Sequence, residues 1–296
     1  MTRRSPVARV MLYLGAALLG LFTLGPFVLS LIASVTPETG LLSFPPDWFR
    51  YGFTLDNYRY IFTGEIPQSF IVRGDIRSMI SEEILQVPNA IGNSFRIAFV
   101  VMLVNVAFGS MAAYAIARLR WRGRNAVFNF LLGSRLIPAV ALALPYYGIV
   151  QGLKLLNNPL ALVLIYAVLT LPLTVLLLTA TFLRIPKAIE ESAQLDGLGA
   201  FQVLRRITLP LAAPGVVGAA LFAFMLSYTE FLFALLLATG RESRTLPVSL
   251  GIVSVNPDVS VGLMHAAVII GILPVLILAV PIWRFMVQGL SEGAGQ

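Results

Sequence analysis

Six long runs without Asp, Glu, Lys or Arg are the feature that most constrains how this chain can fold. They cover residues 10–37, 97–117, 136–153, 155–183, 207–229 and 259–283. A helix needs about 20 mainly apolar residues to cross the hydrocarbon of a bilayer, and each run is near or above that length. The sequence therefore predicts an all-α integral membrane protein with six transmembrane helices.

Composition narrows the possible functions. Hydrophobic residues make up 58% of the chain and charged residues 12%, whereas an average soluble domain carries about 25% charged residues. The chain has no cysteine and one histidine, His265, so we expect no disulfide framework, no metal site and no catalytic cluster. The net charge of +7 comes from cations spread along the loops, which argues against a nucleic-acid partner.

The distribution of cations predicts the orientation in the membrane. With both termini in the cytoplasm, twelve Lys and Arg residues fall inside and seven outside, as the positive-inside rule requires. The first apolar run lacks a cleavage site of the A-x-A type, so we expect it to stay as a transmembrane helix. The inner set is Arg3, Arg4, Arg9, Arg118, Arg120, Arg122, Arg124, Arg184, Lys187, Arg205, Arg206 and Arg284, and the outer set is Arg50, Arg59, Arg73, Arg77, Lys154, Arg241 and Arg244.

A polar segment at 35–92 separates the first two apolar runs, and on this topology it forms an external loop. Apolar residues recur in it at helical spacing after Asp75, a residue type that often caps helices. We expect a short amphipathic helix there that ends before Pro88 and lies on the membrane, contacts an external partner or packs against its own loop. Its apolar face would hold Ile76, Met79, Ile80, Ile84 and Val87.

The segment 184–209 has the pattern of two short helices separated by a turn. Pro186 suits the first turn of a helix, and Glu190 and Glu191 favour its N-terminal end. The glycines of the stretch 197–199 are expected to end it before a second helix begins. On the predicted topology this loop is cytoplasmic, and its first helix needs a docking partner for a small, apolar face. That face is formed by Ile189, Ser192, Ala193 and Leu195.

This segment resembles the EAA loop of the permease subunits of ABC importers. The family pattern is Glu-Ala-Ala, two residues, Asp-Gly, and then Ile-x-Leu-Pro. Ser192 stands where the family usually has alanine, and Leu198 where it often has a small residue; we expect neither difference to prevent docking. The resemblance implies contact with an ATPase subunit through Glu191, Ser192, Ala193, Asp196, Gly197, Ile207, Leu209 and Pro210.

The resemblance extends over about residues 14 to 293 and is most specific for maltose-type carbohydrate permeases. In that family, the second of two different permease subunits has these features. The segments that carry it are Ser43-Phe44-Pro45-Pro46, Thr54-Leu55-Asp56-Asn57-Tyr58, Asn93-Ser94, Ala112-Ala113-Tyr114-Ala115, Leu136-Ile137-Pro138, Thr245-Leu246-Pro247-Val248 and the stretch from Val287 to Ala294.

The resemblance implies an assembly. The whole chain, 1–296, would be one transmembrane domain of an importer in the bacterial plasma membrane. Its partners would be a second permease subunit, two ATPase subunits and an external solute-binding protein, with a carbohydrate as substrate. ATP and Mg would be bound by the ATPase partner, since this chain has no G-x-x-x-x-G-K-[ST] loop to hold phosphates and is not expected to be an enzyme.

Several polar residues in the apolar runs are candidates for the transport pathway. Glu230 lies in or beside the fifth run, where an ionised side chain costs at least about 2.5 to 3.5 kcal/mol unless it is paired or hydrated. It either faces the pathway or a subunit interface, or acts as a structural hydrogen bonder. Arg135 is expected to extend toward an interface. The remaining candidates, which equally suit a membrane interface, are Tyr228, Thr229, Tyr114, Tyr146 and Tyr147.

Two other classes of function stay open on the residues alone. A secondary solute transporter needs an inverted repeat and internal ligands for a coupling ion. We find no such repeat, and the cytoplasmic loop has no use in that scheme. A membrane-embedded enzyme needs paired carboxylates, a Ser/His pair or a metal cluster, but the apolar runs and their edges offer only Glu230, Arg135 and His265.

Overall fold

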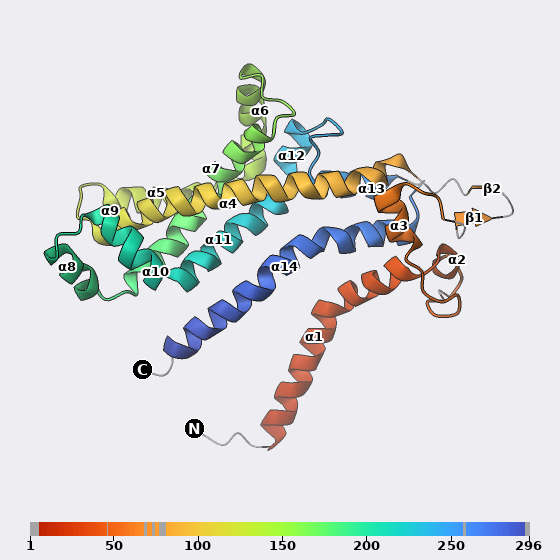
Figure 1. The fold of residues 1–296 in the computed structure, drawn as a ribbon, viewed down its shortest axis with the longest axis horizontal. Helices are drawn as coiled ribbons and strands as arrows, with labels where there is room; N and C mark the ends of the chain where they lie inside the picture. The colour runs from red at the N-terminus through yellow and green to blue at the C-terminus, as the bar shows by residue number, and fades with distance from the viewer. Residues whose placement is uncertain are drawn as a thin grey trace. The chain divides into compact units, whose positions relative to one another are not determined.

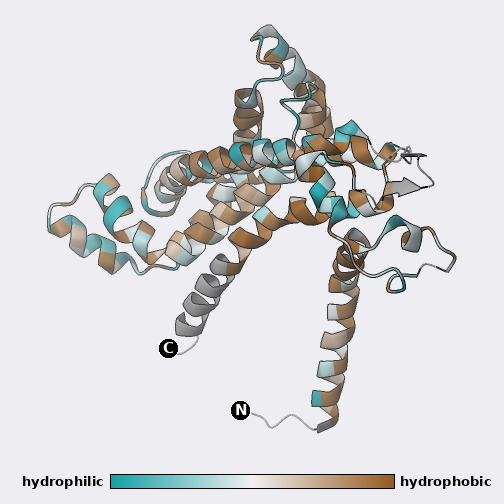
Figure 2. Ribbon diagram, turned by 45° about the vertical axis from the view of Figure 1, so that its right-hand side comes forward, coloured by the Kyte–Doolittle hydropathy of each residue, from teal (hydrophilic) through white to brown (hydrophobic). Residues whose placement is uncertain are grey.

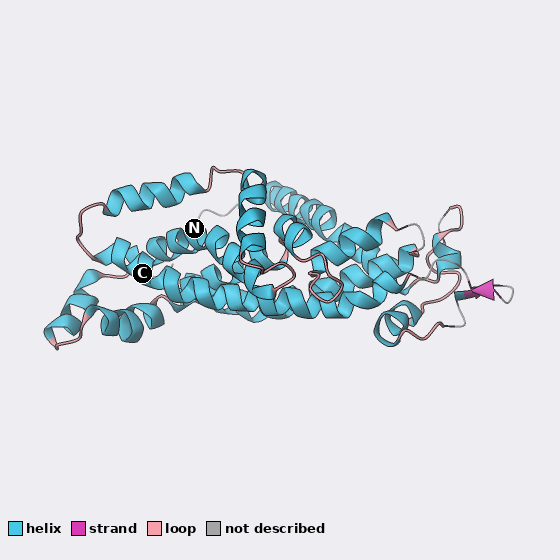
Figure 3. Ribbon diagram, turned by 90° about the horizontal axis from the view of Figure 1, so that it is seen from above, coloured by secondary structure: helices cyan, strands magenta, loops and turns pink. Residues whose placement is uncertain are grey.

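Helices form nearly all of the computed structural model, which describes residues 6–45, 47–67, 70–72, 75–76, 81–256 and 259–293. Figure 3 shows one pair of strands beside them. In chain order the elements are α1 (Pro6–Val35), α2 (Glu38–Leu41), α3 (Asp56–Thr63), β1 (Ile71–Val72), β2 (Asp75–Ile76), η2 (Glu82–Gln86), α4 (Val87–Arg118), α5 (Arg124–Ser134), η3 (Ala139–Leu142), α6 (Ala143–Gly152), α7 (Pro159–Leu183), α8 (Lys187–Leu195), α9 (Ala200–Val203), η4 (Leu204–Thr208), α10 (Leu209–Leu211), α11 (Ala213–Tyr228), α12 (Leu232–Leu237), α13 (Leu246–Val255) and α14 (Val261–Gly293).

The membrane spans agree with the predicted six. Within the described residues, four helices are long and apolar enough to cross a bilayer, and two pairs of shorter helices, each bent at a break, make a fifth and a sixth span. Figure 2 shows hydrophobic residues along much of the long helices. The four are Val7–Val35, Glu82–Arg118, Pro159–Leu183 and Val261–Val280, and the pairs are Arg124–Ser134 with Ala139–Gly152, bent by 97°, and Ala200–Leu211 with Ala213–Tyr228, bent by 88°.

Prolines explain where the bent spans break. Pro138 lies between α5 and η3, and Pro210 and Pro214 lie on either side of the break before α11. A proline has no backbone N–H, and its ring obstructs the carbonyl group four residues earlier, so a regular helix does not continue through it without a kink. At Pro138 the chain therefore breaks between two helices instead of bending gently.

The described chain divides into two compact units, each of which we describe by itself (Figure 1). The first unit contains Met1–Pro88 and Ser249–Ile272, and the second contains Asn89–Val248 and Leu273–Gln296. The first unit therefore holds α1 and the polar segment that follows it. The second unit holds α5 to α12 and most of α4, and it contains the predicted coupling loop.

Buried polar contacts hold the polar segment of the first unit against the end of α1. The Asn57 side chain, 3% exposed, donates a hydrogen bond from Nδ2 to the Ser34 carbonyl oxygen at 2.9 Å. The Ser34 hydroxyl and the Tyr58 hydroxyl lie 2.6 Å apart. Gly262 of α14 approaches Asn57 so closely that an added Cβ would lie 2.7 Å from Nδ2. These contacts satisfy the polar groups that burial removes from water.

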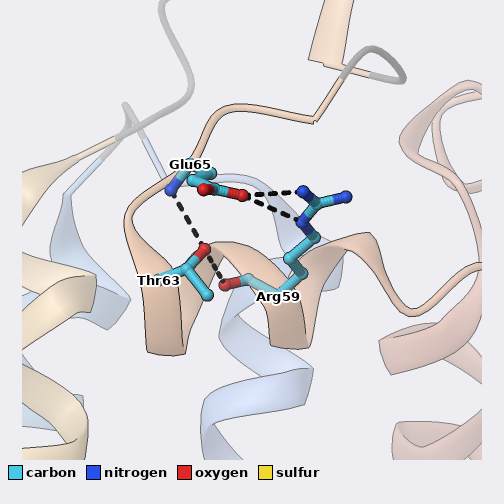
Figure 4. Close-up of polar contacts among 3 residues, drawn as sticks. All are labelled: Arg59, Thr63 and Glu65. Carbon is cyan, nitrogen blue, oxygen red and sulfur yellow. Dashed lines mark hydrogen bonds and ion pairs between the residues drawn. The ribbon is translucent and has the colours of Figure 1, made fainter.

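Polar contacts among Arg59, Thr63 and Glu65 hold the end of α3, as drawn in Figure 4. Gly64 adopts a left-handed conformation with φ +70, which ends the helix. The Thr63 hydroxyl donates to the Arg59 carbonyl oxygen at 2.8 Å and accepts from the Glu65 N–H at 3.1 Å. Arg59 also pairs with Glu65 at 2.7 Å, but these side chains are 62% and 63% exposed, so the pair contributes at most about 1 kcal/mol.

The expected amphipathic helix after Asp75 is wrong for the residues that the structure describes. Asp75 pairs with Val72 in a two-stranded antiparallel hairpin, and Ile76 pairs with Ile71. Met79 and Ile80 lie outside the described residues. The apolar residues farther along the chain do face inward, but from a 3-10 helix, Glu82–Gln86, and from the start of α4. Pro88 lies in the first turn of α4, where a missing N–H costs nothing.

Close packing in the second unit depends on threonines of α7. Their hydroxyls bond carbonyl oxygens of their own helix, as Thr174 does with Thr170 at 3.2 Å and Thr181 with Leu177 at 2.9 Å. Such bonding leaves a compact surface for a neighbouring helix. The threonines therefore allow glycines of α4 and α11 to approach, a device common between membrane helices.

We predict that Gly215→Ala destabilises the second unit. A Cβ at this position would lie 3.0 Å from Thr181 Cβ and closer still to both of its γ atoms, so α7 and α11 would have to separate. Overpacking of this kind typically costs about 1 to 3 kcal/mol. The matched control is Gly133→Ala in α5, where nothing lies within 4 Å of an added Cβ. Thermal unfolding in detergent measures both, and equal melting temperatures would contradict the packing argument.

Candidate functional site

The predicted pair of short helices is present at 187–203. The first, α8, follows Pro186, whose backbone is extended, and ends at Asp196. Gly197 then adopts a left-handed conformation with φ +91, which only glycine takes up at little cost. The Gly199 N–H donates to Gln202 Oε1 at 3.0 Å as α9 begins. Helices α8, α9 and α10 lie together at one end of the second unit (Figure 1).

A buried ion pair fixes α8 to this end of the unit. Arg118 Nε lies 2.7 Å from Glu190 Oε2, and the two side chains are 6% and 4% exposed. Arg118 Nη2 also donates to the carbonyl oxygens of Phe182 at 2.7 Å and Ile185 at 2.8 Å. The second carboxylate oxygen, Glu190 Oε1, accepts a hydrogen bond from the Thr208 hydroxyl at 2.8 Å. The carboxylate is thus balanced by one cation and one hydroxyl.

Apolar packing surrounds the ion pair. Ala193 of α8 joins a cluster of buried residues from α4, α7, α9 and α11. The cluster includes Tyr114, which is 4% exposed and experiences the charges of both Glu190 and Arg118. The buried core of the second unit therefore includes the face of α8 that carries Ala193.

The opposite side of the helix pair carries exposed apolar side chains. Leu195 is 90% exposed, Phe201 is 62% exposed and Ile189 is 43% exposed. The small, apolar face expected from the sequence is therefore divided, because Ala193 is buried in the core while Ile189 and Leu195 are exposed. Large exposed apolar side chains on a loop this short indicate a surface that another molecule covers.

The eight predicted coupling residues fall into two sets. Glu191, Ser192, Asp196 and Gly197 are exposed on α8 and at its end. Ala193 is buried, and Ile207 and Leu209 are half-buried against the core cluster, whereas Pro210 is exposed. The first set is available to a partner, and most of the second set holds the helix pair to the rest of the unit.

The predicted pathway residues lie in two places. Tyr146 of α6 packs edge-on against Phe233 of α12, with ring centroids 5.7 Å apart. Tyr228 is buried and stacks on Phe224, and the Thr229 hydroxyl donates to the Met225 carbonyl oxygen at 2.8 Å. Tyr147 is half-buried in α6. Tyr114 is separate from all of these, since it lies beside α8.

Glu230 has structural partners at the start of α12. Its carboxylate oxygens accept hydrogen bonds from the N–H groups of Phe233, at 3.1 and 3.2 Å, and Ala234, at 3.3 Å. A carboxylate is favoured at a helix N-terminus because the first N–H groups have no partner within the helix. The side chain is half-buried.

Two segments singled out in the sequence meet at the start of α4. Asn93 Nδ2 donates to the carbonyl oxygens of Glu242 at 2.6 Å and Arg244 at 3.0 Å. The Leu246 N–H donates to the Ser94 hydroxyl oxygen at 2.8 Å. The Asn-Ser pair therefore fixes the loop that leads into Leu246-Pro247-Val248.

Arg118, Glu190 and Thr208, which meet in a buried polar cluster, were not among the predicted site residues. Arg118 was counted only among the cations, and Glu190 only as favouring the start of a helix. One signal was present: Arg118 directly follows an apolar run, where a charge needs a partner. The sequence alone does not reveal which carboxylate supplies that partner.

Comparisons with known proteins identify the family. The family model described as "Binding-protein-dependent transport system inner membrane component" matches residues 105–287. The trehalose/maltose transport system permease protein MalG of Thermococcus litoralis is 32% identical over 293 residues, which cover 99% of this chain and 98% of the relative. The sulfoquinovosyl glycerol transport system permease protein SmoH of Agrobacterium fabrum is 31% identical over 281 residues, covering 95% of this chain and 92% of the relative.

A solved structure gives the same fold. A chain of a bacterial ABC transporter involved in the import of the acidic polysaccharide alginate superposes with a TM-score of 0.74 at 19% identity, covering 96% of this chain and 99% of that one. Permeases of this family work with separate ATPase and solute-binding proteins, and ATP hydrolysis takes place on the ATPase subunits. The match over residues 105–287 and the relatives of similar length show that this chain belongs to the inner-membrane components of binding-protein-dependent transport systems, the permease subunits of ABC importers.

Proposed function

We propose that this chain is one of two different permease subunits in an importer of a sugar or a sugar-like solute. The names of the two relatives, for trehalose/maltose and for sulfoquinovosyl glycerol, support a carbohydrate as the solute. The complete importer holds this permease, a second permease, two ATPase subunits and an external solute-binding protein. Both termini of the chain lie in the cytoplasm, so the loop at 184–209 faces the ATPase.

The exposed side of α8 and α9 is the observation that carries this proposal. Ile189, Leu195 and Phe201 expose apolar side chains on the same pair of helices that exposes the polar residues Glu191 and Asp196. A surface of this kind fits a cleft in a soluble partner, where the apolar side chains leave water and the charged ones remain at the rim. We name Ile189, Leu195 and Phe201, together with Glu191, Ser192, Asp196 and Gly197, the docking face.

The docking face couples ATP hydrolysis to transport. ATP and Mg are bound by the ATPase subunits, and their closure around the nucleotide moves the cleft that holds α8. Ala193, Ile207, Leu209 and Pro210 support the docking face and join it to the membrane helices. Closure and opening then shift the permease between inward-facing and outward-facing states.

The solute passes near the bent spans. Glu230, Tyr228, Thr229, Tyr146 and Tyr147 are our candidates for that part of the pathway, because α6, α11 and α12 bring several of them close together through Phe233 and Phe224. Aromatic faces and hydroxyl groups suit the recognition of sugars. Tyr114 is kept as a pathway candidate, although its place beside α8 favours a role at the coupling end.

The topology predicts opposite accessibility for two single cysteines. Phe53→Cys and Arg122→Cys replace exposed residues, and the parent chain contains no other cysteine. An impermeant maleimide should label position 53 in intact spheroplasts of a bacterial host and label position 122 only after the membrane is opened. Labelling of both positions in intact spheroplasts would contradict the proposed orientation.

We predict that Gly197→Asp and Leu195→Asp each release the ATPase subunit. Aspartate at 197 is strained by the left-handed backbone, and either carboxylate loses water in the cleft without gaining a partner. Recovery of the ATPase with the affinity-tagged permease should fall by about tenfold or more, the effect of about 1.4 kcal/mol. The measurement is quantitative co-purification in detergent, together with the rate of ATP hydrolysis.

Gly52→Asp is the matched control for Gly197→Asp. Gly52 has φ +72, and nothing lies within 4 Å of an added Cβ, so the substitution brings the same backbone strain far from the docking face in sequence. It should leave ATPase recovery at the level of the parent. Parent-level recovery for both docking-face variants would mean that α8 and α9 do not hold the ATPase.

A further inference from the structure

Arg118 joins the ends of two membrane helices to α8. It is the last residue of α4, and its guanidinium donates to the carbonyl oxygens of Phe182, at the end of α7, and Ile185, just beyond that end. The last carbonyl groups of a helix have no partner within the helix. The same guanidinium pairs with Glu190 on α8 at 2.7 Å. One side chain thus connects α4, to which it belongs, with the end of α7 and with α8.

Glu190 extends the connection to a fourth segment. Its other carboxylate oxygen accepts from Thr208, which is fully buried and lies in the π-helical turn before α10 and α11. The bent span that continues into α11 is therefore connected to the same carboxylate. Glu190 is buried although its neighbour Glu191 is exposed, so the two glutamates lie on different faces of α8.

The chemistry of these contacts makes the connection rigid. Apolar side chains such as Ala193 can slide over their neighbours at little cost. A planar guanidinium that donates to two carbonyl oxygens and lies 2.7 Å from a carboxylate oxygen as an ion pair is restricted in position and in orientation. Burial prevents water from replacing any of these partners, so the segments cannot separate one at a time without leaving a charge unpaired.

We propose that Arg118 and Glu190 are positioning residues that force α8 to move as one body with the inner ends of α4 and α7. Force from the ATPase enters at the docking face and reaches the membrane helices through this ion pair. The proposal rests on the proposed function, because it takes the docking face as the place where force enters. It assigns the pair to the transmission of movement, whereas ATPase binding belongs to the residues on the exposed side of α8.

The test separates binding of the ATPase from transmission of movement. Removing one partner leaves a buried charge alone and endangers folding, so the main variant is the double replacement Arg118→Met with Glu190→Leu. Replacing both members of a buried ion pair by apolar residues of similar volume often preserves stability. Two single replacements keep part of the interaction: Arg118→Lys keeps the positive charge, and Glu190→Gln keeps a side chain that can form hydrogen bonds. They show whether the transmitted movement increases with the number of contacts retained.

The reporter is a fluorescent bimane group on Leu164→Cys. Leu164 lies on α7, more than four turns before Phe182 along the helix, and is 51% exposed. The complete complex, purified with its ATPase subunits, is treated with Mg-ATP and vanadate, so that no transported solute is needed. The fluorescence change, the amount of ATPase recovered and the rate of ATP hydrolysis are measured on the same sample. Arg120→Met, an exposed arginine two residues beyond Arg118, is the matched control.

In the parent and in Arg120→Met, Mg-ATP with vanadate should change the bimane fluorescence to the same extent. The double variant should retain its ATPase and hydrolyse ATP, while its fluorescence change falls by about fivefold or more, the low end of ordinary coupling between sites. The fluorescence changes of Arg118→Lys and Glu190→Gln should lie between those of the parent and the double variant.

Two results would overturn the proposal. If the double variant shows the parent fluorescence change, movement reaches α7 without the ion pair. If the double variant no longer binds the ATPase, the ion pair is needed to hold the docking face in shape, and its role is not the transmission of movement. Failure of the proposed function gives a different pattern, since the ATPase would then remain bound when Leu195 or Gly197 is changed.

Discussion

Every other feature of this structure depends on the need of backbone N–H and C=O groups for partners inside a membrane. Hydrocarbon supplies none, so the spans must be helices, and each place where a helix ends or bends needs side chains that bond the freed groups. Arg118 does this at the end of α7, where it bonds the carbonyl oxygens of Phe182 and Ile185. Arg135 also bonds the backbone of this helix, because its Nη1 donates to the Leu169 carbonyl oxygen at 2.9 Å. Arg118 was expected only to mark the topology, and Arg135 only to extend toward an interface. Both side chains also form hydrogen bonds with the backbone.

The sequence predicted those features that depend on local pattern. Apolar runs located the spans, because a helix in lipid needs a continuous apolar surface. Gly197 and its neighbours located the turn between α8 and α9, because few other residues accept that backbone conformation. The 3-10 helix before α4 was mistaken for a longer amphipathic helix, since Ile84 and Val87 have the same spacing in both. The pairing of Arg118 with Glu190 was not predictable, because no local pattern connects residues so far apart in the chain.

The proposed coupling motif would combine two tasks in one short helix, α8. Glu190 and Glu191 are adjacent, yet one is buried against Arg118 while the other faces away. Successive residues of a helix point about 100° apart, so an inner and an outer surface must share consecutive positions. A docking surface held only by apolar contacts could change its tilt without moving the membrane helices. A charged residue on the inner side of α8 prevents this, and it leaves the outer side free to match a partner.

The ion pair also affects how the chain is made. Arg118 is synthesised 72 residues before Glu190, and at about 5 to 20 residues per second it waits about 4 to 14 s for its carboxylate. During that time the guanidinium has to remain hydrated at the membrane surface, although Phe182 and Ile185 offer their carbonyl groups shortly before the carboxylate appears. Closure of α8 onto α4 through this ion pair therefore has to wait for Glu190, which follows the whole of α7 in the chain. The contacts that fix α8 are thus formed only after every residue of α4 and α7 has been translated.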